Sequence, residues 1–552
     1  MELHDENTFK IRSYQSAVNT IDRGDVSIEG KNLQELQEVN GIGKSIAEAI
    51  LALDTTGTSP YLEDLLAKTP VGILEVLEIK GLGPKKIKVL WEELNITSIH
   101  ELMEACQSGQ VAKTKGFGEK TQESIIQSLE FRASNQGKWL YADIEDTMIQ
   151  FQQKVKSVSG VEAVTSVGEF ARKMEIIESV EWLVATTDHT IVMTSFSAFK
   201  NLEQNKKSSS PYKWRGKMLD PEISLLIHFT QPTDFFKEKI IRTGSKAHLL
   251  HPVEDNKPFI ELIRESNDLY SEEEAYDNAG FPWIPEELRE GFFEFDWAKE
   301  NKIPTLLEEK DLKGILHNHS TYSDGKHSLR QMAEYCKELG YEYLGISDHS
   351  RSAFYAGGLD IEKIQQQHKE IDELNKELAP FKIFKGIESD ILLDGSLDYP
   401  NEVLKSFDFI VSSILSSLGM DRKKATARLI KAIENPYTTI LGHPTGRLLL
   451  RREGYPIDHK AIIDACSKFN VVIEINANPW RLDLDWRWVQ YAMEKGVTLS
   501  INPDAHEMEG YADMRYGVLV GRKGGLSKDM TFNALSLAEM QDYLNKRKNK
   551  VN

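Results

Sequence analysis

Seven short apolar runs, separated by helical segments, fill about the last 240 residues of the chain, from Lys313 onward. Strands that alternate with helices imply a parallel sheet, and in βα barrels the working residues lie at the C-terminal ends of the strands. Five of the runs end in His, Asp or Glu and a sixth ends in Asn, so these side chains are predicted to meet at one mouth. The runs are KGILHNH, YEYLGISDH, FKIFKGIE, FDFIVSSIL, TTILGH, VVIEINAN and VTLSINPDAH.

Eight side chains in and beside these runs are candidate metal ligands. A single buried histidine is more often a hydrogen-bonded core residue than a ligand, but convergence at one mouth reverses that preference. Eight ligands are too many for one ion, and mixed imidazole and carboxylate ligands favour Mn²⁺, Zn²⁺ or Fe²⁺ over Mg²⁺. The candidates are His317, His319, Asp324, His349, Glu388, His443, Asp504 and His506.

A second pattern, Gly-apolar-Gly before a helix, occurs three times near the N-terminus. The glycines allow a tight turn, and the following helix directs free N–H groups at an anion, while the apolar residue (Ile42, Leu82, Phe117) fills the core between two helices. One copy alone would be read as ordinary helix packing, but three copies beside lysines predict helix-hairpin-helix units that hold a DNA backbone. The predicted DNA contacts are Gly41, Gly43, Lys44, Gly81, Gly83, Lys85, Gly116 and Gly118.

Length and composition limit the function classes. A chain of 552 residues predicts three to five domains. The net charge of −19 provides no global attraction for a polyanion, so DNA must be held by local patches, backbone amides or metals. The start MELHDENTFK is too charged for a signal peptide and no stretch is long enough to span a membrane, so a cytoplasmic location is expected. The protein is also expected to be a monomer. The cysteines Cys106, Cys336 and Cys466 are predicted to be reduced packing residues.

The N-terminal half resembles the family X DNA polymerases. FKIRSYQSAVNTI (9–21) is similar to that family's opening helix, the TGS triplet at 243–245 is typical of its thumb, and SEEEAYDNAGFPWIPEELRE (271–290) matches the pattern at the same place. The resemblance implies lyase-like and fingers-like hairpins followed by a nucleotidyltransferase palm and thumb. In members with deoxyribose-phosphate lyase activity, a Schiff-base lysine stands where this chain has Ala49, so lyase activity by that route is not expected.

The implied palm lacks its metal-binding carboxylates. Nucleotidyl transfer needs two metals held by carboxylates on adjacent strands. By motif position, Glu169 replaces a triphosphate-binding serine, and by spacing from the TGS triplet Leu226 replaces the last Asp. Because leucine cannot bind a metal and Glu169 would repel a triphosphate, we expect polymerase activity to be lost or severely impaired. The degenerate positions are Glu169, Ser179, Glu181 and Leu226.

The barrel resembles the PHP (polymerase and histidinol phosphatase) family in HNHSTYSDG, SDHS, GIESDILLDGSLDY, GHPTGR, EINANPWRLDLDW and PDAHEMEG. The resemblance implies one metal at His317, His319, Glu388 and Asp504, a second at Asp324, His349 and His506, and a third served by Glu388 and His443. The family usually has a histidine where VSSILSS places Leu415, so two or three ions, Mn²⁺ or Zn²⁺, are expected. Arg447 and Arg481, beside the motifs, are expected to bind substrate phosphate.

The expected fold is therefore multidomain: an all-α helix-hairpin-helix region, an α+β palm and thumb, and a C-terminal α/β seven-stranded (βα) barrel. The expected domains are hairpins at 1–135, palm at 140–235, thumb-like segment at 236–300, linker at 301–312 and PHP barrel at 313–552. The basic end of the chain, 544–552, is expected to be a solvated tail.

The leading hypothesis is a DNA repair protein whose barrel is a metal-dependent 3′-5′ exonuclease acting on gapped DNA or on 3′ ends. The exonuclease polarity comes from the resemblance, whereas the residues alone indicate hydrolysis of a phosphate ester. Three alternatives remain open: a catalytically silent DNA-binding scaffold, a phosphatase of small phosphomonoesters, and a polymerase that is still active. The last requires a displaced palm motif that uses acids such as Glu175, Glu178 or Asp188.

Overall fold

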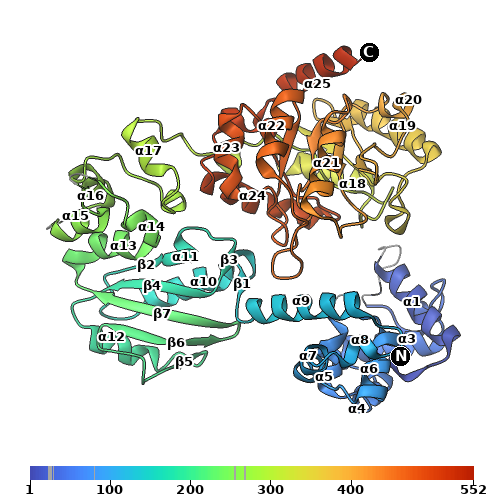
Figure 1. The fold of residues 1–552 in the computed structure, drawn as a ribbon, viewed down its shortest axis with the longest axis horizontal. Coiled ribbons are helices and arrows are strands. Elements are labelled where there is room, and N and C mark those ends of the chain that lie inside the picture. The colour runs from blue at the N-terminus through green and yellow to red at the C-terminus, as the bar shows by residue number, and fades with distance from the viewer. Residues whose placement is uncertain (23–27, 29, 80, 254–255, 267–268, 552) are drawn as a thin grey trace. The chain divides into compact units, whose positions relative to one another are not determined.

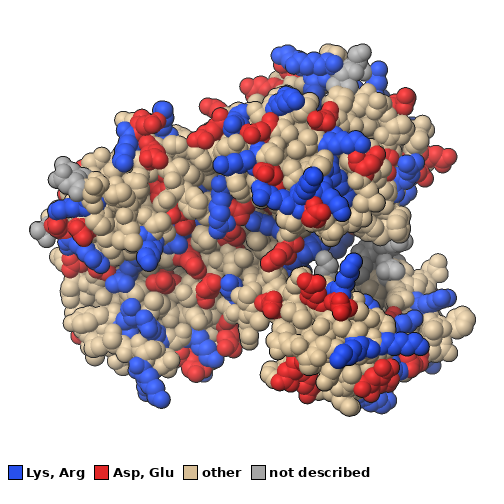
Figure 2. Space-filling view, viewed as in Figure 1, with Lys and Arg blue, Asp and Glu red and all other residues tan. Residues whose placement is uncertain are grey.

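A computed structural model gives the fold of the chain (Figure 1). It describes residues 1–552 except 23–27, 29, 80, 254–255, 267–268 and 552. The chain divides into two compact units, Met1–Gln136 and Gly137–Asn552. In the view of Figure 2, Lys and Arg side chains are mixed with Asp and Glu over the surfaces of both units. Within the described residues, no helix combines the length and the apolar character needed to cross a membrane.

The first unit is built from helices joined by short turns. Each Gly-apolar-Gly pattern forms the turn of a hairpin, and the predicted core residues Ile42 and Leu82 are only 3% and 4% exposed. Phe117 in the third hairpin is partly buried. The helices are α1 (Thr8–Asp22), α2 (Leu33–Gln37), α3 (Lys44–Thr56), α4 (Pro60–Ala67), α5 (Val71–Leu77), α6 (Pro84–Leu94), α7 (Ile99–Gln107), α8 (Gln110–Lys113) and α9 (Glu119–Asn135).

The palm opens the second unit as a mixed five-stranded sheet in the order β2-β4-β7-β6-β5. Apolar residues of α10 and α12 pack on the sheet, with Phe151 and Phe196 in the same buried cluster as Trp182. A short pair, β1 (Trp139–Leu140) with β3 (Ile176–Ile177), lies beside it. The other elements are α10 (Tyr141–Lys156), β2 (Ala163–Val167), α11 (Gly168–Ala171), β4 (Ser179–Ala185), α12 (His189–Phe196), β5 (Leu202–Gln204), β6 (Lys213–Leu219) and β7 (Glu222–Thr230).

The thumb is a small helical bundle with an aromatic core in which the ring of Phe295 packs edge-on against that of Phe259. Arg289 is fully buried, and its guanidinium donates to the carboxylate of Glu272 at 2.7 Å. This buried charge pair is a part of the thumb that periodicity did not predict. The elements are α13 (Phe235–Thr243), α14 (Lys246–Leu249), α15 (Phe259–Glu265), α16 (Glu272–Asn278), η4 (Glu286–Leu288) and α17 (Glu294–Lys299).

The barrel contains two parallel sheets, β10-β9-β8 and β11-β12-β13-β14-β15. Parallel bridges close the ring at both seams, one between Asn318 and Ala505 and the other between His349 and Glu388. The predicted run FKIFKGIE is divided into β10 and β11, so seven runs form eight short strands. These are β8 (Gly314–Ile315), β9 (Tyr343–Ile346), β10 (Lys382–Lys385), β11 (Glu388–Asp390), β12 (Val411–Ser413), β13 (Ile440–Leu441), β14 (Val472–Asn476) and β15 (Leu499–Asn502).

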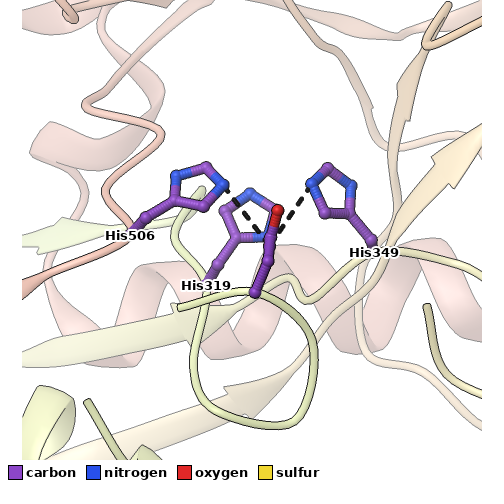
Figure 3. Close-up of side chains that lie close together, drawn as sticks. His319, His349 and His506 are labelled. Carbon is purple, nitrogen blue, oxygen red and sulfur yellow. Dashed lines mark ion pairs between the residues drawn. The ribbon is translucent and has the colours of Figure 1, made fainter. Parts of the chain in front are cut away.

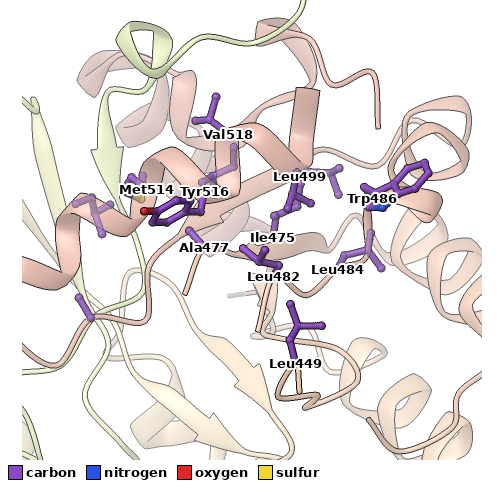
Figure 4. Packing of buried hydrophobic residues seen from close by; sticks show 14 of the residues in the cluster. Leu449, Ile475, Ala477, Leu482, Leu484, Trp486, Leu499, Met514, Tyr516 and Val518 are labelled. Carbon is purple, nitrogen blue, oxygen red and sulfur yellow. The ribbon is translucent and has the colours of Figure 1, made fainter. Parts of the chain in front are cut away.

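Helices follow most of these strands and carry the apolar residues that pack on them. Figure 4 shows this packing where Met514 and Val518 of α24 lie near Ile475 and Leu499 of the sheet. The alternation of strands and helices predicted from sequence is thus present. The helices are α18 (Leu329–Glu338), α19 (Ile361–Glu377), α20 (Asn401–Leu404), α21 (Arg422–Ile433), α22 (His459–Phe469), α23 (Val489–Glu494), α24 (Met514–Lys523) and α25 (Leu537–Val551).

Helix α24 joins the barrel to the thumb and palm within the second unit. At its C-terminal end, Arg522 contacts Glu287 at 2.9 Å, and the ammonium of Lys523, only 1% exposed, donates to Glu290. The carboxylate of Glu290 also forms an ion pair with Arg172 of the palm, with 2.8 Å between Nε and Oε1. These buried ion pairs fasten three parts of the chain to one another.

The prediction of a solvated tail from Leu544 onward is wrong. Helix α25 extends to Val551, Leu544 is 3% exposed, and Arg547 donates to the carbonyl oxygens of Asn470 and Thr438. Asn552 lies outside the described residues. The basic run KRKNK suggested solvent, but Met540, Tyr543 and Leu544, which precede it in the helix, place one helix face against the barrel.

Candidate metal centre

Four of the predicted ligands meet at one side of the barrel mouth. The Asp324 carboxylate lies 3.6 Å from Nε2 of His349, 3.5 Å from Nε2 of His506 and 4.0 Å from Nδ1 of His319. Figure 3 shows the three labelled imidazoles around a common point, each carried by a different loop. One donor atom from each of the four lies within 4.8 Å of the others, which suits a shared cation.

The other four predicted ligands, together with His319, form two further groups that share His317. One contains His317, His443 and Asp504, and the other contains His317, His319 and Glu388. The Nε2 atom of His317 lies 3.4 Å from both Glu388 and Asp504, and Nε2 of His443 lies 3.0 Å from Glu388. The structure thus brings all eight candidates together at one mouth, as the strand pattern predicted; that they bind metal stays a prediction.

Several buried polar atoms in these groups have no hydrogen-bond partner among the residues that the structure describes. An unsatisfied buried polar atom costs about 1–3 kcal/mol, so a group of them needs an explanation. Glu388 Oε2 and His349 Nδ1 lie 2.8 Å apart but without hydrogen-bond geometry. Divalent cations would satisfy such atoms, and the residues present therefore fit a metal centre. The unsatisfied atoms are His317 Nε2, His319 Nδ1, His349 Nδ1, His443 Nδ1 and Glu388 Oε2.

The pKa values of the ligands reflect this crowding. Burial lowers the pKa of His317, but the surrounding carboxylates, Glu474 first, raise it well above its ordinary value. The same balance, led by Glu388, raises the pKa of His349 to about 9. Burial together with the neighbouring imidazoles instead lowers the pKa of His319 well below its ordinary value. Ionised carboxylates therefore dominate the centre, and a cation there would be stabilised.

Glu474 was not predicted from sequence, although it organises the centre. Fully buried in β14, its carboxylate lies 2.7 Å from Nδ1 of His317 and accepts the backbone N–H of His443 at 2.8 Å. A carboxylate behind a histidine fixes the tautomer and the direction of the ring. The signal was present in the sequence, because an acid in the middle of the apolar run VVIEINAN must find a partner when buried.

The two arginines expected to bind phosphate have different environments. The Nε atom of Arg481 lies 3.4 Å from the Asp504 carboxylate, beside the ligands. Arg447 instead donates to the carbonyl oxygens of Arg481 and Leu482 and contacts Asp485 at 2.6 Å. Its donors hold the loop that carries Arg481, so the structure does not support Arg447 as a direct phosphate contact.

Leu415 follows β12 at the mouth and is half-buried. Its backbone N–H donates to the carboxylate of Asp390 at 3.0 Å. A leucine side chain offers no donor atom to a cation. Leu415 therefore cannot replace the histidine that the PHP family usually has at this position.

The hairpin glycines adopt the conformations that the pattern predicted. Gly41, Gly81 and Gly116 have φ of +89°, +86° and +90°, where only glycine is unstrained. Gly43, Gly83 and Gly118 are N-caps without a side-chain cap, so backbone N–H groups in the first turns of α3, α6 and α9 remain available to an anion, although α6 begins with Pro84, which has no N–H. Lys44 and Lys85 are exposed beside two of these turns.

Three of the four degenerate palm positions lie together on the sheet. Glu181 on β4 pairs directly with Leu226 on β7, and Ser179 lies two residues earlier on β4. The carboxylate of Glu181 lies 3.0 Å from Nε2 of His228. Burial raises the pKa of Glu169, in α11, where nearby acids act in the same direction. Among the described residues, every grouping of His, Cys, Asp and Glu suited to a metal lies in the barrel.

The acids that could replace the lost carboxylates are engaged elsewhere. Glu175 is buried and accepts from the indole N–H of Trp486 at 3.2 Å. Glu178 pairs with Lys138 at 3.0 Å, and Asp188 caps the N-terminus of α12. These roles are structural and leave no second carboxylate set on the palm sheet in the described part of the chain.

Comparison with known proteins places these parts in context. Protein-family models match residues 1–59 (helix-hairpin-helix domain), 73–130 (SAM-like helix-hairpin-helix tandem) and 316–506 (PHP domain). A protein of Bacillus subtilis (strain 168) named DNA polymerase/3′-5′ exonuclease PolX is 34% identical over 571 residues, which cover 99% of this chain and 96% of that protein.

Other similarities cover the barrel alone or are weak. A probable phosphatase of Thermoanaerobacter sp. (strain X514) is 24% identical over 259 residues, 44% of this chain and 98% of that protein. A crystal structure of histidinol phosphate phosphatase from Lactococcus lactis with zinc, L-histidinol and phosphate has 17% identity over 39% of this chain and 94% of its own. Its TM-score of 0.33 is too low to carry an argument.

Proposed function

Because the chain belongs to the PolX family, DNA polymerases of family X that carry a PHP domain, we propose that its barrel is a metal-dependent 3′-5′ exonuclease and that its palm no longer polymerises. The barrel would hydrolyse phosphodiester bonds at 3′ ends of DNA, including those in gaps, and the protein would act as a monomer. The observation that carries the proposal is the convergence of eight His, Asp and Glu side chains with unsatisfied buried atoms at one mouth.

The ligands divide naturally between two ions. His317, His319, Glu388 and Asp504 would hold one, and Asp324, His349 and His506 would hold the other. Bound divalent ions supply a metal-activated water and electrostatic stabilisation of the phosphate in hydrolysis. His443 orients Glu388 at 3.0 Å, and Leu415 leaves a third ion without its usual histidine. Imidazole-rich ligands favour Mn²⁺ or Zn²⁺ over Mg²⁺.

Arg481 supplies the substrate phosphate contact. It lies beside Asp504 and is partly exposed, so its guanidinium can reach a phosphate held at the metal ligands. Arg447 is a positioning residue, because its hydrogen bonds to the carbonyls of residues 481 and 482 fix the loop.

The hairpins supply DNA affinity without sequence readout. Three uncapped helix N-termini offer backbone N–H groups to phosphates, with Lys44, Lys85 and neighbouring lysines adding charge. Such binding is local, which agrees with a chain whose net charge is −19.

The proposed loss of polymerase activity rests on the residues that β4 and β7 place side by side in the palm sheet. Position 226 offers a leucine beside Glu181, and Glu181 is already paired with His228. The substituted sheet therefore lacks the adjacent carboxylates that would hold two metals for nucleotidyl transfer.

A second candidate, hydrolysis of small phosphomonoesters, is favoured by the similarity of the barrel to the probable phosphatase. It uses the same ligands but leaves the hairpins without a role. Competition between DNA and a chromogenic phosphomonoester separates the two: strong inhibition by DNA at low concentration supports the exonuclease.

The test incubates the full chain and Mn²⁺ with 5′-labelled gapped DNA, with and without dNTPs, beside a His317→Ala, His319→Ala variant. We expect shortening from the 3′ end that the double variant abolishes. Extension by dNTPs would overturn the palm assignment. Intact DNA in every lane, with no bound metal in the purified protein, would favour a silent scaffold.

A further inference from the structure

Two exposed aromatic side chains, Phe354 and Tyr355, lie on a loop at the barrel mouth. Their exposed fractions are 84% and 65%, and their ring centroids are 6.1 Å apart in an edge-to-face arrangement. A pair of adjacent rings left in water at the entrance to a polar site is unfavourable unless a ligand covers it.

The loop that carries these rings begins at a proposed metal ligand, His349, and is closed by a backbone hydrogen bond to the same residue. It leaves the barrel after His349 and returns at Leu359, whose backbone N–H donates to the carbonyl oxygen of His349 at 2.8 Å. The two rings lie on η6 (Phe354–Ala356) at the tip, while Ala353 in the same loop is 1% exposed. The rings therefore stand beside the metal centre on a loop anchored within the barrel.

The loop backbone is fixed without help from the rings. The backbone N–H of Ser352 donates to Asp398 at 2.5 Å, and the ammonium of Lys363 donates to the carbonyl oxygen of Gly357 at 3.0 Å. A Cβ atom added to Gly357 would lie 3.3 Å from the carbonyl oxygen of Ser323, the residue before Asp324. The surrounding contacts thus preorganise the loop backbone that carries the rings, which lowers the entropy cost of binding a ligand on them.

Charge supports the same placement. Burial and the carboxylates of Glu388, Asp390 and Asp324 raise the pKa of Tyr355, so this phenol is neutral and lies in the field of the metal ligands. The positive charge of Arg481 acts on Tyr355 in the opposite direction and lowers its pKa. A polymer held by its phosphate at Arg481 and the metal ligands would thus bring its adjoining base toward the rings.

We propose that Phe354 and Tyr355 form a stacking platform for the terminal nucleobases of the strand whose phosphodiester bond is cleaved at the metal centre. The proposal rests on the proposed exonuclease function and names the part of the substrate that the metal ligands cannot recognise. Every base has a π face, so such a platform binds ends without sequence preference. Phosphate contacts alone would not distinguish a nucleotide from another phosphodiester.

The test compares two 5′-labelled oligonucleotides in Mn²⁺, one ordinary and one whose two 3′-terminal nucleotides lack their bases. For the full-length wild type we expect the base-free end to raise KM about tenfold or more, the effect of losing a stacked base. In the Phe354→Ala, Tyr355→Ala variant, KM for the ordinary end should rise by a similar factor, while cleavage of the base-free end should be unchanged.

Conservative variants separate stacking from loop damage. Tyr355→Phe and Phe354→Trp keep the rings and should keep the preference for an end with bases. Tyr270→Ala, which removes an 81% exposed ring from the thumb, is the matched control and should behave as wild type. Equal KM for both ends in the wild type, with no change in the double variant, would overturn the platform while leaving the exonuclease intact. Failure of the wild type to cleave either end would instead reject the proposed function.

Discussion

Glu474 fixes the ring of His317 from behind, through the 2.7 Å contact with Nδ1. Replacing its carboxylate in Glu474→Gln removes the charge that favours this orientation, and partners of this kind typically contribute 10–100-fold to metal affinity, by order of magnitude. We expect Mn²⁺ or Zn²⁺ affinity to fall by about that factor in calorimetric titration of metal-stripped protein. Glu453→Gln, an exposed acid in the same barrel, should leave the affinity unchanged. A dissociation constant within twofold of wild type for Glu474→Gln would contradict the orienting role.

Under the proposed function, the number of metal ions should depend on the side chain at position 415. In Leu415→His an imidazole replaces an alkyl group at the mouth, near the strand end that also carries Asp390. We expect elemental analysis of protein saturated with Mn²⁺ to find about one more ion per chain than in wild type, as a completed third ligand set requires. Leu393→His, at a 74% exposed position of the barrel, should add none. An unchanged ion count in Leu415→His would show that this histidine is not what the third site lacks.

At this scale, position along a strand predicted more than residue type did. His319, Glu388 and His443 were identifiable as candidate ligands because each ends an apolar run, and strand ends share one mouth. Arg447 has the right chemistry for a phosphate, but its carbonyl partners at 481 and 482 come from a loop whose path no periodicity reveals.

Within the thumb, the buried Arg289–Glu272 pair holds α16 against η4. Burial alone would raise the pKa of Glu272, but Arg289 and then Lys239 lower it below the ordinary value of 4.5. A carboxyl group whose pKa is lower in the folded than in the unfolded protein stabilises the fold. This stabilisation is fully present at pH values above the unfolded pKa, and it is lost as the pH falls through the folded pKa. The pair should therefore stabilise the thumb at neutral pH and fail progressively in acid below about pH 4.5.

The variant Glu272→Gln tests this element. The variant leaves a buried guanidinium without its anion. We therefore expect the free energy of unfolding, measured in urea at pH 7, to fall by about 3 kcal/mol or more. The difference from wild type should shrink as the pH is lowered, because the wild-type carboxylate then becomes protonated as well. Glu273→Gln, on the neighbouring exposed position, is the control. Equal loss at pH 7 and at low pH would rule out the charge as the cause.

Elements with a clear period were predictable, and irregular ones were not. The hairpins around Gly41, Gly81 and Gly116 followed from repetition of one turn. By contrast, the run FKIFKGIE is split between two sheets because the chain passes from β10 to β11 at Gly386, where a Cβ would collide with Phe409. That collision depends on a side chain from the segment just before β12, so the run itself carried no sign of the break.

Across the second unit, Lys523 tests whether the barrel, thumb and palm unfold together. Burial lowers the pKa of its ammonium, Glu290 opposes that shift, and the carbonyl oxygen of Arg172 accepts at 2.9 Å. Lys523→Met keeps a side chain of similar length but removes the hydrogen bonds of the ammonium to Arg172 and Glu290. We therefore expect the free energy of unfolding to fall by about 1–3 kcal/mol. Hydrogen exchange at α24 should accelerate in the variant. Lys528→Met, an exposed cation nearby, should have little effect, and equal behaviour of the two variants would contradict the fastening role.

The order of parts along the chain was predictable from motifs, but their attachment to one another was not. Arg172, Glu290 and Lys523 are far apart in sequence, and each alone resembles an ordinary surface charge. Only the fold reveals that they are buried together.

Helix α24 also gives a physical reason why a palm without the expected metal-binding carboxylates would be retained. The helix begins shortly after Asp504 and His506 and ends at Lys523, so the same short stretch of chain serves the metal mouth and the junction with the palm. A descendant that deleted the palm would uncover the buried end of this helix and disturb the support of two ligands. Under the proposed function, the palm would therefore be retained as structural support for the metal ligands of the barrel, not for polymerisation.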